Sequence, residues 1–338
     1  MFKKIFIAAA IIVLSVSSMA MAAPKYSLKI GHESAPDSMM DHMAKTFKAY
    51  VEKESKGQIQ VSIFPSNQVG DPFAVLQGMQ TGVVEMGILN GGSVATVLKD
   101  FAIFSVPEIL PKDSAKNMKV FAPGSPFVKR LVANSEKTGI KFLGIYVEPF
   151  FQVTANKKIQ NPADFKGLKI RTMNSPIILA TYKALGANPT PIPFSEVYSG
   201  LQTNMIDGQE NPLDIIYEMS YFEVQKYLME TNHSTVVNML YISSPLFSKM
   251  PRELQDIVVK GGQVSQEYMF KYVPKLAAES REKLAKTGKI EMVASTPEIS
   301  AAYKKAAEAA KGEYFKLVGE KEGKEIFKSL EETLKSIK

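Results

Sequence analysis

The sequence has 338 residues, of which 45% are hydrophobic, so it can form two ordinary folded domains. The formal charge of +7 is spread along the chain, and no basic stripe with interleaved aromatic residues is present, which argues against nucleic-acid binding. Cysteine is absent, which excludes disulfides and thiol chemistry.

The N-terminus has the pattern of an export signal. Lys3 and Lys4 precede an apolar run over residues 5–16, and small residues up to Ala22 supply a cleavage site. The apolar run is too short to span a bilayer as a helix. We expect residues 1–22 to be removed, leaving a formal charge of +5. The mature protein is expected in the periplasm without a lipid anchor, because no cysteine follows the signal.

The next part of the chain alternates between predicted strands and helices. Residues 26–31, 59–63 and 83–89 have the alternating pattern of strands. Helices are expected between them, with an apolar face over residues 40–51 and a start at Asp71-Pro72. This alternation predicts βαβ units with a largely parallel sheet.

A second α/β unit is expected from about residue 149. Residues 151–155 and 168–172 are strand-like, and Asn161-Pro162 starts a short helix between them. Residues 223–228 are predicted to form a short amphipathic helix, and residues 236–242 a buried strand that returns to the first unit. The tail from Thr296 is predicted to be helical. Two lobes joined by several crossings would form a cleft at the ends of the strands.

The segment 186–213, GANPTPIPFSEVYSGLQTNMIDGQENPL, has the features of a site. Its three alternating prolines demand an extended path. Ser195 is predicted to cap a helix that carries residues 197, 201 and 205 on one face. After a turn at residues 207–208, Asn211 is predicted to cap a second helix that begins at Pro212. Helix N-termini bind anions, so we expect this segment to face an anionic ligand.

Arg171, at the end of a predicted strand, can hold a carboxylate with two parallel N–H···O bonds. A surface ion pair is an equally common use of such an arginine. Asn211 can donate to the same ligand, although a plain helix cap is the commoner role. Phe194 and Phe151 are candidates for the walls of the site, with core packing as the alternative, and Gln209 and Glu210 are candidates that can also hold the loop.

The chain gives little indication of catalysis. Of its three histidines, His32 and His233 could line the cleft, although a structural role is commoner, and they have no metal-ligand spacing. No G-x-S-x-G, H-E-x-x-H, G-x-G-x-x-G or Walker sequence occurs. An S-x-x-K match at Ser280 shares one charged helix with Lys286-Thr287-Gly288, and we discount it. We therefore expect binding rather than catalysis, with no metal and no cofactor.

Several motifs together resemble one family. PTPIPFSEVYSGLQTNMIDGQENPL is preceded by NPADFKGLKIR and followed by EVQKYL and T-x-H, and the N-terminal part contains FPSNQVGD and QTGVVEM. From about residue 26 to the end, the chain resembles the C4-dicarboxylate-binding receptors of tripartite ATP-independent periplasmic (TRAP) transporters.

The resemblance implies a two-lobed α/β fold like that of type II periplasmic-binding proteins. The two lobes would close on an organic acid. The ligand would pass to the small and large membrane subunits of a permease driven by an ion gradient, and we expect a monomer. Residues 24–148 and 237–276 would form one lobe, and residues 149–236 and 277–338 the other. By similarity, Arg171 clamps the carboxylate, Asn211 assists it and Phe194 lines the cleft. His32, Glu33 and Asn90 would meet the distal part of the ligand.

One departure from the family pattern bears on the ligand. Many relatives have an Arg or Lys where this chain has Phe151. Without that cation, and with Glu33 across the cleft, a second ligand carboxylate would lack a partner, so a monocarboxylate with an apolar or aromatic body is expected. Two alternatives remain open at this point. One is a ligand-sensing protein for a membrane kinase, and the other is an exported enzyme with His32 or His233 as its base.

Overall fold

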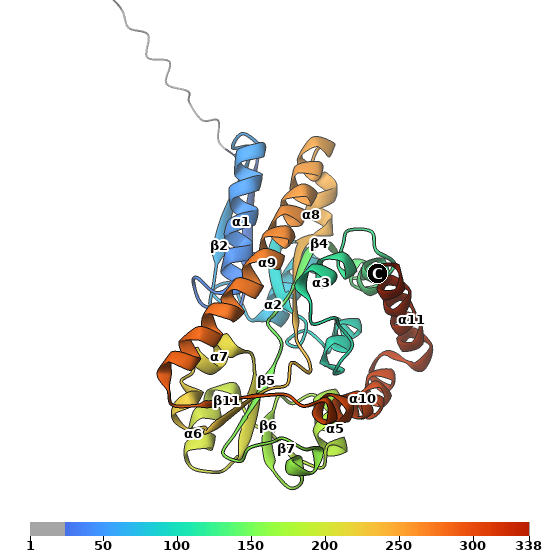
Figure 1. The fold of residues 1–338 in the computed structure, drawn as a ribbon. Coiled ribbons are helices and arrows are strands. Elements are labelled where there is room, and N and C mark those ends of the chain that lie inside the picture. The colour runs from blue at the N-terminus through green and yellow to red at the C-terminus, as the bar shows by residue number, and fades with distance from the viewer. Residues whose placement is uncertain (1–23, 338) are drawn as a thin grey trace, which may run out of the picture.

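The computed structural model describes residues 24–337, so the predicted signal at residues 1–22 lies outside the described part of the chain. Figure 1 shows two lobes, each built around its own β-sheet, with the long helix α9 (Arg252–Thr287) running from one lobe to the other. Over residues 24–337, no helix combines the length and the apolar character needed to cross a membrane. The predicted two-lobed α/β fold is confirmed.

The first lobe contains a five-stranded sheet with the order β2-β1-β3-β10-β4. Strands β1, β2 and β3 are parallel, whereas β10 is antiparallel to both of its neighbours. Because β10 comes late in the chain, the predicted return of residues 236–242 to the first unit is confirmed. The strands are β1 (Tyr26–Gly31), β2 (Ile59–Phe64), β3 (Met86–Asn90), β4 (Ile140–Val147) and β10 (Val237–Ser243).

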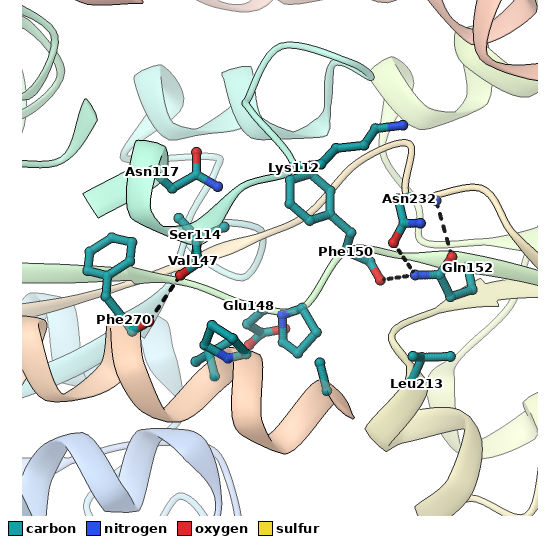
Figure 2. Close-up of a pocket in the computed structure, with 14 residues that line it drawn as sticks. Lys112, Ser114, Asn117, Val147, Glu148, Phe150, Gln152, Leu213, Asn232 and Phe270 are labelled. Atoms are coloured by element: carbon teal, nitrogen blue, oxygen red, sulfur yellow. Dashed lines mark hydrogen bonds between the residues drawn. The ribbon is translucent and has the colours of Figure 1, made fainter. Parts of the chain in front are cut away.

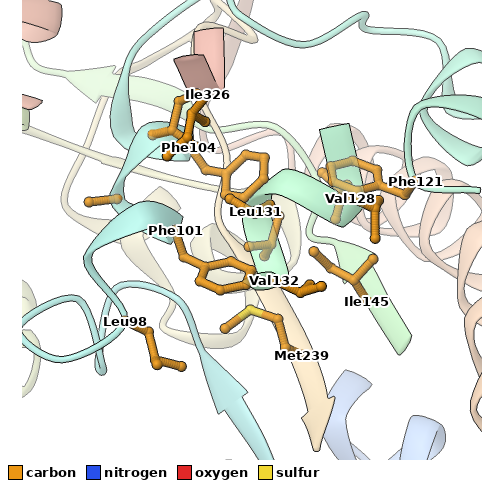
Figure 3. Packing of buried hydrophobic residues seen from close by; sticks show 14 of the residues in the cluster. Leu98, Phe101, Phe104, Phe121, Val128, Leu131, Val132, Ile145, Met239 and Ile326 are labelled. Carbon is orange, nitrogen blue, oxygen red and sulfur yellow. The ribbon is translucent and has the colours of Figure 1, made fainter. Parts of the chain in front are cut away.

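Helices cover both faces of this sheet. Helices α1, α8 and the first part of α9 enclose one core, and α2, η1, α3 and α4 enclose the other. Figure 3 shows the second core, where the rings of Phe104 and Phe121 lie 5.7 Å apart near Leu131 and Met239. The helices are α1 (Met39–Glu54), α2 (Pro72–Thr81), η1 (Lys99–Ser105), α3 (Ser114–Val120), α4 (Pro126–Glu136) and α8 (Ser244–Lys249).

The second lobe contains a six-stranded sheet with the order β11-β9-β5-β8-β6-β7. Helices α5 and α10 pack on one of its faces, and α6, α7 and the end of α9 pack on the other. The strands are β5 (Gln152–Ala155), β6 (Lys169–Thr172), β7 (Asn188–Pro191), β8 (Gly208–Asn211), β9 (Tyr227–Glu230) and β11 (Glu291–Ala294). The helices are η2 (Pro162–Phe165), α5 (Pro176–Ala184), η3 (Phe194–Glu196), α6 (Val197–Gln202), α7 (Leu213–Glu218), η4 (Tyr221–Glu223) and α10 (Pro297–Val318). The last helix, α11 (Glu320–Ser336), packs against the first lobe instead.

After α6 a turn does follow, at residues 203–207, but the cap predicted at Asn211 is wrong. Residues 208–211 form strand β8 between β5 and β6, and Asn211 makes no cap because the N-cap of α7 is Pro212. Ser195 likewise lies in the 3₁₀ turn η3, and α6 starts after it without a side-chain cap. A polar tetrapeptide can form a central strand here because its side chains bond to neighbouring strands, which local propensity does not reveal.

Other local predictions have mixed outcomes. The helix expected over residues 223–228 is wrong, because that segment enters strand β9. The alternating prolines do run extended, as edge strand β7, where a missing N–H costs little. The helix starts at Asn161-Pro162 and Thr296 are confirmed, and the hydroxyl of Thr296 accepts from the Ile299 N–H.

The chain crosses between the lobes in two segments that lie side by side. The N–H of Glu148 donates to the carbonyl of Val236 (3.0 Å), and that of Phe151 to the carbonyl of Ser234 (2.9 Å). Helix α9 makes a further crossing. Helix α11 packs on α4, so the end of the chain lies with the first lobe, although residues 277–338 were expected in the second. The packing of Ile326 and Leu330 into the core of the first lobe accounts for this difference.

Candidate functional site

Arg171 lies on strand β6 of the second sheet, next to the edge strand β7. Its neighbours across the sheet are Thr190 on β7 and Gln209 on β8. The residue is only 4% exposed. Its Nε and Nη2 atoms both donate to the carbonyl of Ile192, at 3.2 and 3.1 Å. The proline-rich segment therefore fixes the direction of the guanidinium group.

The charge of Arg171 has no carboxylate partner among residues 24–337. Phe194 covers one side of the guanidinium, with its ring centroid 5.9 Å from Cζ, and this ring is itself 44% exposed. Burial lowers the pKa of Arg171, while the nearby Tyr221 and Glu210 act in the opposite direction. A buried guanidinium that uses two of its five N–H groups on one carbonyl still has donors for an anion.

A row of polar side chains continues from Arg171 across the same face of the sheet. Asn211 Nδ2 donates to Gln209 Oε1 (2.5 Å), and Gln209 Nε2 donates to Thr154 Oγ1 (3.0 Å). Thr154 in turn donates to Gln225 (3.0 Å). Residues paired across neighbouring strands share a face, so Gln209 and Asn211 lie on the face of Arg171. The sequence-predicted residues Arg171, Gln209 and Asn211 are thus brought together.

The first lobe contributes a second polar group at the ends of its strands. Ser93 Oγ donates to both carboxylate oxygens of Glu33, at 2.9 and 3.1 Å. The side chain of Asn90 donates to Asn238 (3.2 Å), which donates to Glu148 (2.7 Å). Glu33 and Asn90, both predicted as site residues, therefore belong to one group with Asn238 and Glu148.

Three carboxyl groups lie near the junction of the lobes. Burial, together with the charges of Asp214 and Glu33, raises the pKa of Glu148 to about 8, although the hydrogen bond from Asn238 acts in the opposite direction. Burial also raises the pKa of Asp214 to about 6 and that of Glu33 above its usual range. The Oδ1 atom of Asp214 is buried without a hydrogen-bond partner in the described part of the chain, and so is the hydroxyl of Tyr146.

A cavity of about 260 Å³ borders this junction. Figure 2 shows Glu148 above helix α9, with Phe150 nearby and Leu213 on α7 beside them. The side chain of Gln152 donates to the carbonyl of Phe150 (2.8 Å) and to Asn232 (2.7 Å). The other residues that line the cavity are Lys112, Ser114, Asn117, Val147, Pro149, Phe270, Val273, Pro274 and Ala277.

Glu210 and His233 do not lie beside Arg171. Glu210 alternates with Gln209 and Asn211 along β8, so it lies on the opposite face, under α5 and α10. His233 Nε2 and the hydroxyl of Tyr182 each lie 2.8 Å from Glu210 Oε2, and the His233 ring stacks on Tyr303 at 4.4 Å. These side chains are a buried polar network between sheet and helices, which corrects their placement in the cleft.

His32 and Phe151 are also buried. The side chain of His32 has no exposed area and lies beside Asp41 of α1, with Nε2 3.6 Å from Oδ1. Burial lowers the pKa of His32, although Asp41 acts in the opposite direction. Phe151 is 5% exposed, and its neighbour Phe150 lines the cavity instead. Each residue therefore packs within its lobe in this structure.

Sequence reasoning missed Glu148, Asp214, Tyr146 and Asn238. Glu148 follows directly after an apolar strand, and Asp214 lies in the first turn of a helix, so each position offered a weak local signal. Their proximity depends on the arrangement of the lobes. Over residues 24–337, no group of three or more His, Asp or Glu side chains could hold a metal ion.

Comparisons with known proteins fit this geometry. A family model described as "Bacterial extracellular solute-binding protein, family 7" matches residues 30–317. The chain is 32% identical to the 2,3-diketo-L-gulonate-binding periplasmic protein YiaO of Escherichia coli over 259 residues, covering 76% of this chain and 77% of that protein. It is 29% identical to the ectoine-binding periplasmic protein TeaA of Halomonas elongata over 320 residues, covering 94% and 93%.

A solved structure has the same arrangement. The periplasmic ectoine-binding protein from the TeaABC TRAP transporter of Halomonas elongata superposes with a TM-score of 0.82 at 27% identity, covering 92% of this chain and 99% of that chain.

Proposed function

Since the chain belongs to family 7 of the bacterial extracellular solute-binding proteins, we propose that it binds a small organic acid between its lobes, with the carboxylate on Arg171. Its relatives are periplasmic receptors of TRAP transporters and not enzymes. The receptor would close on the acid and deliver it to the two membrane subunits of a TRAP permease. An ion gradient across the membrane would drive uptake through that permease.

The observation that carries this proposal is the unpaired charge of Arg171. A guanidinium that is 4% exposed and has no ion pair within residues 24–337 is costly for the free protein. Such a cost is offset when an anion arrives, because charge-assisted hydrogen bonds are roughly twice as strong as neutral ones. Asn211 and Phe194 would complete this end of the site, the first as a donor and the second as a wall.

We further propose a single carboxylate on the ligand. The resemblance places a second cation of many relatives at Phe151, which cannot pair with an anion. Glu33 and Asp214 at the junction would repel a second carboxylate, and an unpaired buried charge costs several kcal/mol. Two relatives are named for binding 2,3-diketo-L-gulonate and ectoine, so the ligands of such receptors are not limited to C4-dicarboxylates.

Native mass spectrometry of freshly purified protein tests the proposal most directly, by identifying a small acid that co-purifies with it. The mass spectrum is expected to contain an intact carboxylic acid, and release of a chemically altered product would instead support an enzyme. Titration calorimetry with succinate, malate and a range of monocarboxylates then tests the charge of the ligand. Tighter binding of succinate or malate than of every monocarboxylate would contradict the single-carboxylate proposal.

A further inference from the structure

The carboxyl groups of Glu33, Glu148 and Asp214 come from three separate elements and lie at the junction of the lobes. Glu33 follows β1, Glu148 follows β4, and Asp214 lies in the first turn of α7 in the second lobe. Each of the charges of Glu33 and Asp214 acts on Glu148. Figure 2 shows Glu148 between α9 and the start of α7. Closure of the lobes would bring these acids around whatever the cleft holds.

Hydrogen bonds hold two of these acids in place but neutralise neither. Glu33 accepts from Ser93, and Glu148 accepts from Asn238. Through residues 24–337, none of the three acids forms an ion pair with a Lys, Arg or His side chain. A metal ion does not explain the group either, because the described acids are not arranged as a metal site.

Two buried polar atoms at the junction also lack partners. Asp214 is 4% exposed, and its Oδ1 atom has no hydrogen-bond partner in the part of the chain that the structure describes. The hydroxyl of Tyr146, which is fully buried, also lacks one within that part, and the charges of Glu148, Asp214 and Glu33 all act on it. An unpaired buried carboxylate or hydroxyl costs about 1–3 kcal/mol or more, so this end of the site requires a donor.

The two ends of the site therefore differ in charge. Arg171 supplies a cation on the polar face of the second sheet. Asp214 and Glu33 supply carboxylates at the junction, whereas Glu148, with a pKa of about 8, is mostly protonated at neutral pH. We propose that the ligand is a small carboxylate that also carries a positively charged nitrogen, which Asp214 and Glu33 accept while Arg171 holds the carboxylate. This inference rests on the proposed function and specifies the chemical class of its ligand. An ammonium or iminium group fits because it has only donors, and the two buried atoms at the junction that lack partners within residues 24–337, Asp214 Oδ1 and the Tyr146 hydroxyl oxygen, can both accept.

Matched pairs of acids test the inference by titration calorimetry. Each pair has a similar shape and differs in the positive charge: L-proline and cyclopentanecarboxylate, pipecolate and cyclohexanecarboxylate, and 4-aminobutanoate and pentanoate. In the pair that fits the site, we expect the zwitterion to bind at least tenfold more tightly than the carboxylate that lacks the positively charged nitrogen. The three pairs also separate a nitrogen next to the carboxylate from one at the far end. The inference would be overturned if the acid that binds most tightly among the six had no positive charge, or if no zwitterion bound.

Variants identify the residues responsible. In Asp214→Asn and Glu33→Gln, the preference for the zwitterion is expected to fall at least fivefold. The affinity for the matched carboxylate without a positive charge should stay within about twofold of the wild-type value. Glu308→Gln, an exposed acid on α10 that pairs with Lys311, is the matched control and should leave both affinities unchanged. Thermal unfolding without ligand verifies that each variant folds. An unchanged preference in both folded cleft variants would refute the role of these acids.

The result also separates this inference from the proposed function. If only carboxylates without a positive charge bind, and Arg171→Ala abolishes their binding, the proposed carboxylate-binding function is supported. Only the proposal of a positive charge on the ligand is then refuted. If no carboxylate of either class binds, both proposals fail.

Discussion

Replacing Arg171 by alanine is expected to weaken ligand binding at least tenfold without unfolding the protein. Two of the five N–H groups of the guanidinium bond to Ile192, which leaves three for the ligand. Two charge-assisted bonds at about 1.5–3 kcal/mol each amount to roughly 3–6 kcal/mol. That is a factor of roughly 10² to 10⁴ in affinity. Water that enters the space left by the side chain recovers part of this energy, so tenfold is the lower bound.

The stability of the free protein should respond in the opposite way. Arg171 is a buried charge without an ionic partner in residues 24–337, so its removal relieves an electrostatic cost even though Ile192 loses two donors. We expect Arg171→Met to unfold, without ligand, at the temperature of the wild type or above it. In saturating ligand the order reverses, because binding stabilises only the wild type.

Calorimetry with the co-purifying acid, after its removal by unfolding and refolding, gives the affinities. Arg281→Ala is the matched control, because this arginine pairs with Glu230 of the second lobe at 2.7 Å and is half-exposed. Its loss should change the affinity by less than twofold. Equal affinities for the wild type and a folded Arg171→Ala would remove Arg171 from the site and refute the reasoning.

Three further outcomes are expected. The pKa of Glu148 is about 8 when folded and 4.5 ordinarily, so the folded state binds more protons between these values and the free energy of unfolding falls as pH rises through them. Glu148→Gln should remove this slope, at most about 1.4 kcal/mol per pH unit in urea titrations, and an unchanged slope would contradict the assignment. Glu210→Ala should destabilise the protein by about 3–5 kcal/mol in the same assay because it leaves His233 without its buried partner, and a loss below 1 kcal/mol would show that the pair is dispensable. Small-angle scattering should show a smaller radius of gyration with ligand than without it, whereas identical curves would argue against closure.

The sequence predicted the elements whose signals are local. Asn161-Pro162 and Thr296 start helices because a polar cap and a proline act within one turn, and both starts are confirmed. The tetrapeptide 208–211 could not be predicted in this way. It is a strand between β5 and β6, and its Gln209 side chain donates to Thr154, 55 positions earlier in the chain, so part of its stability comes from a distant segment.

The candidate site divides in a similar manner. Arg171 was predictable because a strand that alternates apolar and basic residues places its arginine on one face. The side on which Glu210 lies was not, since that required the correct assignment of strand β8. Glu148 and Asp214 are far apart in sequence, and only the crossing segments and α9 bring them together. Local sequence patterns contain no information on how close Glu148 and Asp214 lie in the fold.

Helix α9 sets the mechanics of the molecule. In its first half the backbone of Gly262 lies against β4 so closely that a Cβ atom there would come within 2.4 Å of the Leu143 carbonyl oxygen, which anchors this half to the first sheet. Its last turns bury Leu284 in the second lobe. Pro274, between these anchors, lacks the N–H that would bond to the preceding turn, so flexure concentrates there. Closure of the lobes, as proposed above, would therefore bend α9 at Pro274 and not along its whole length.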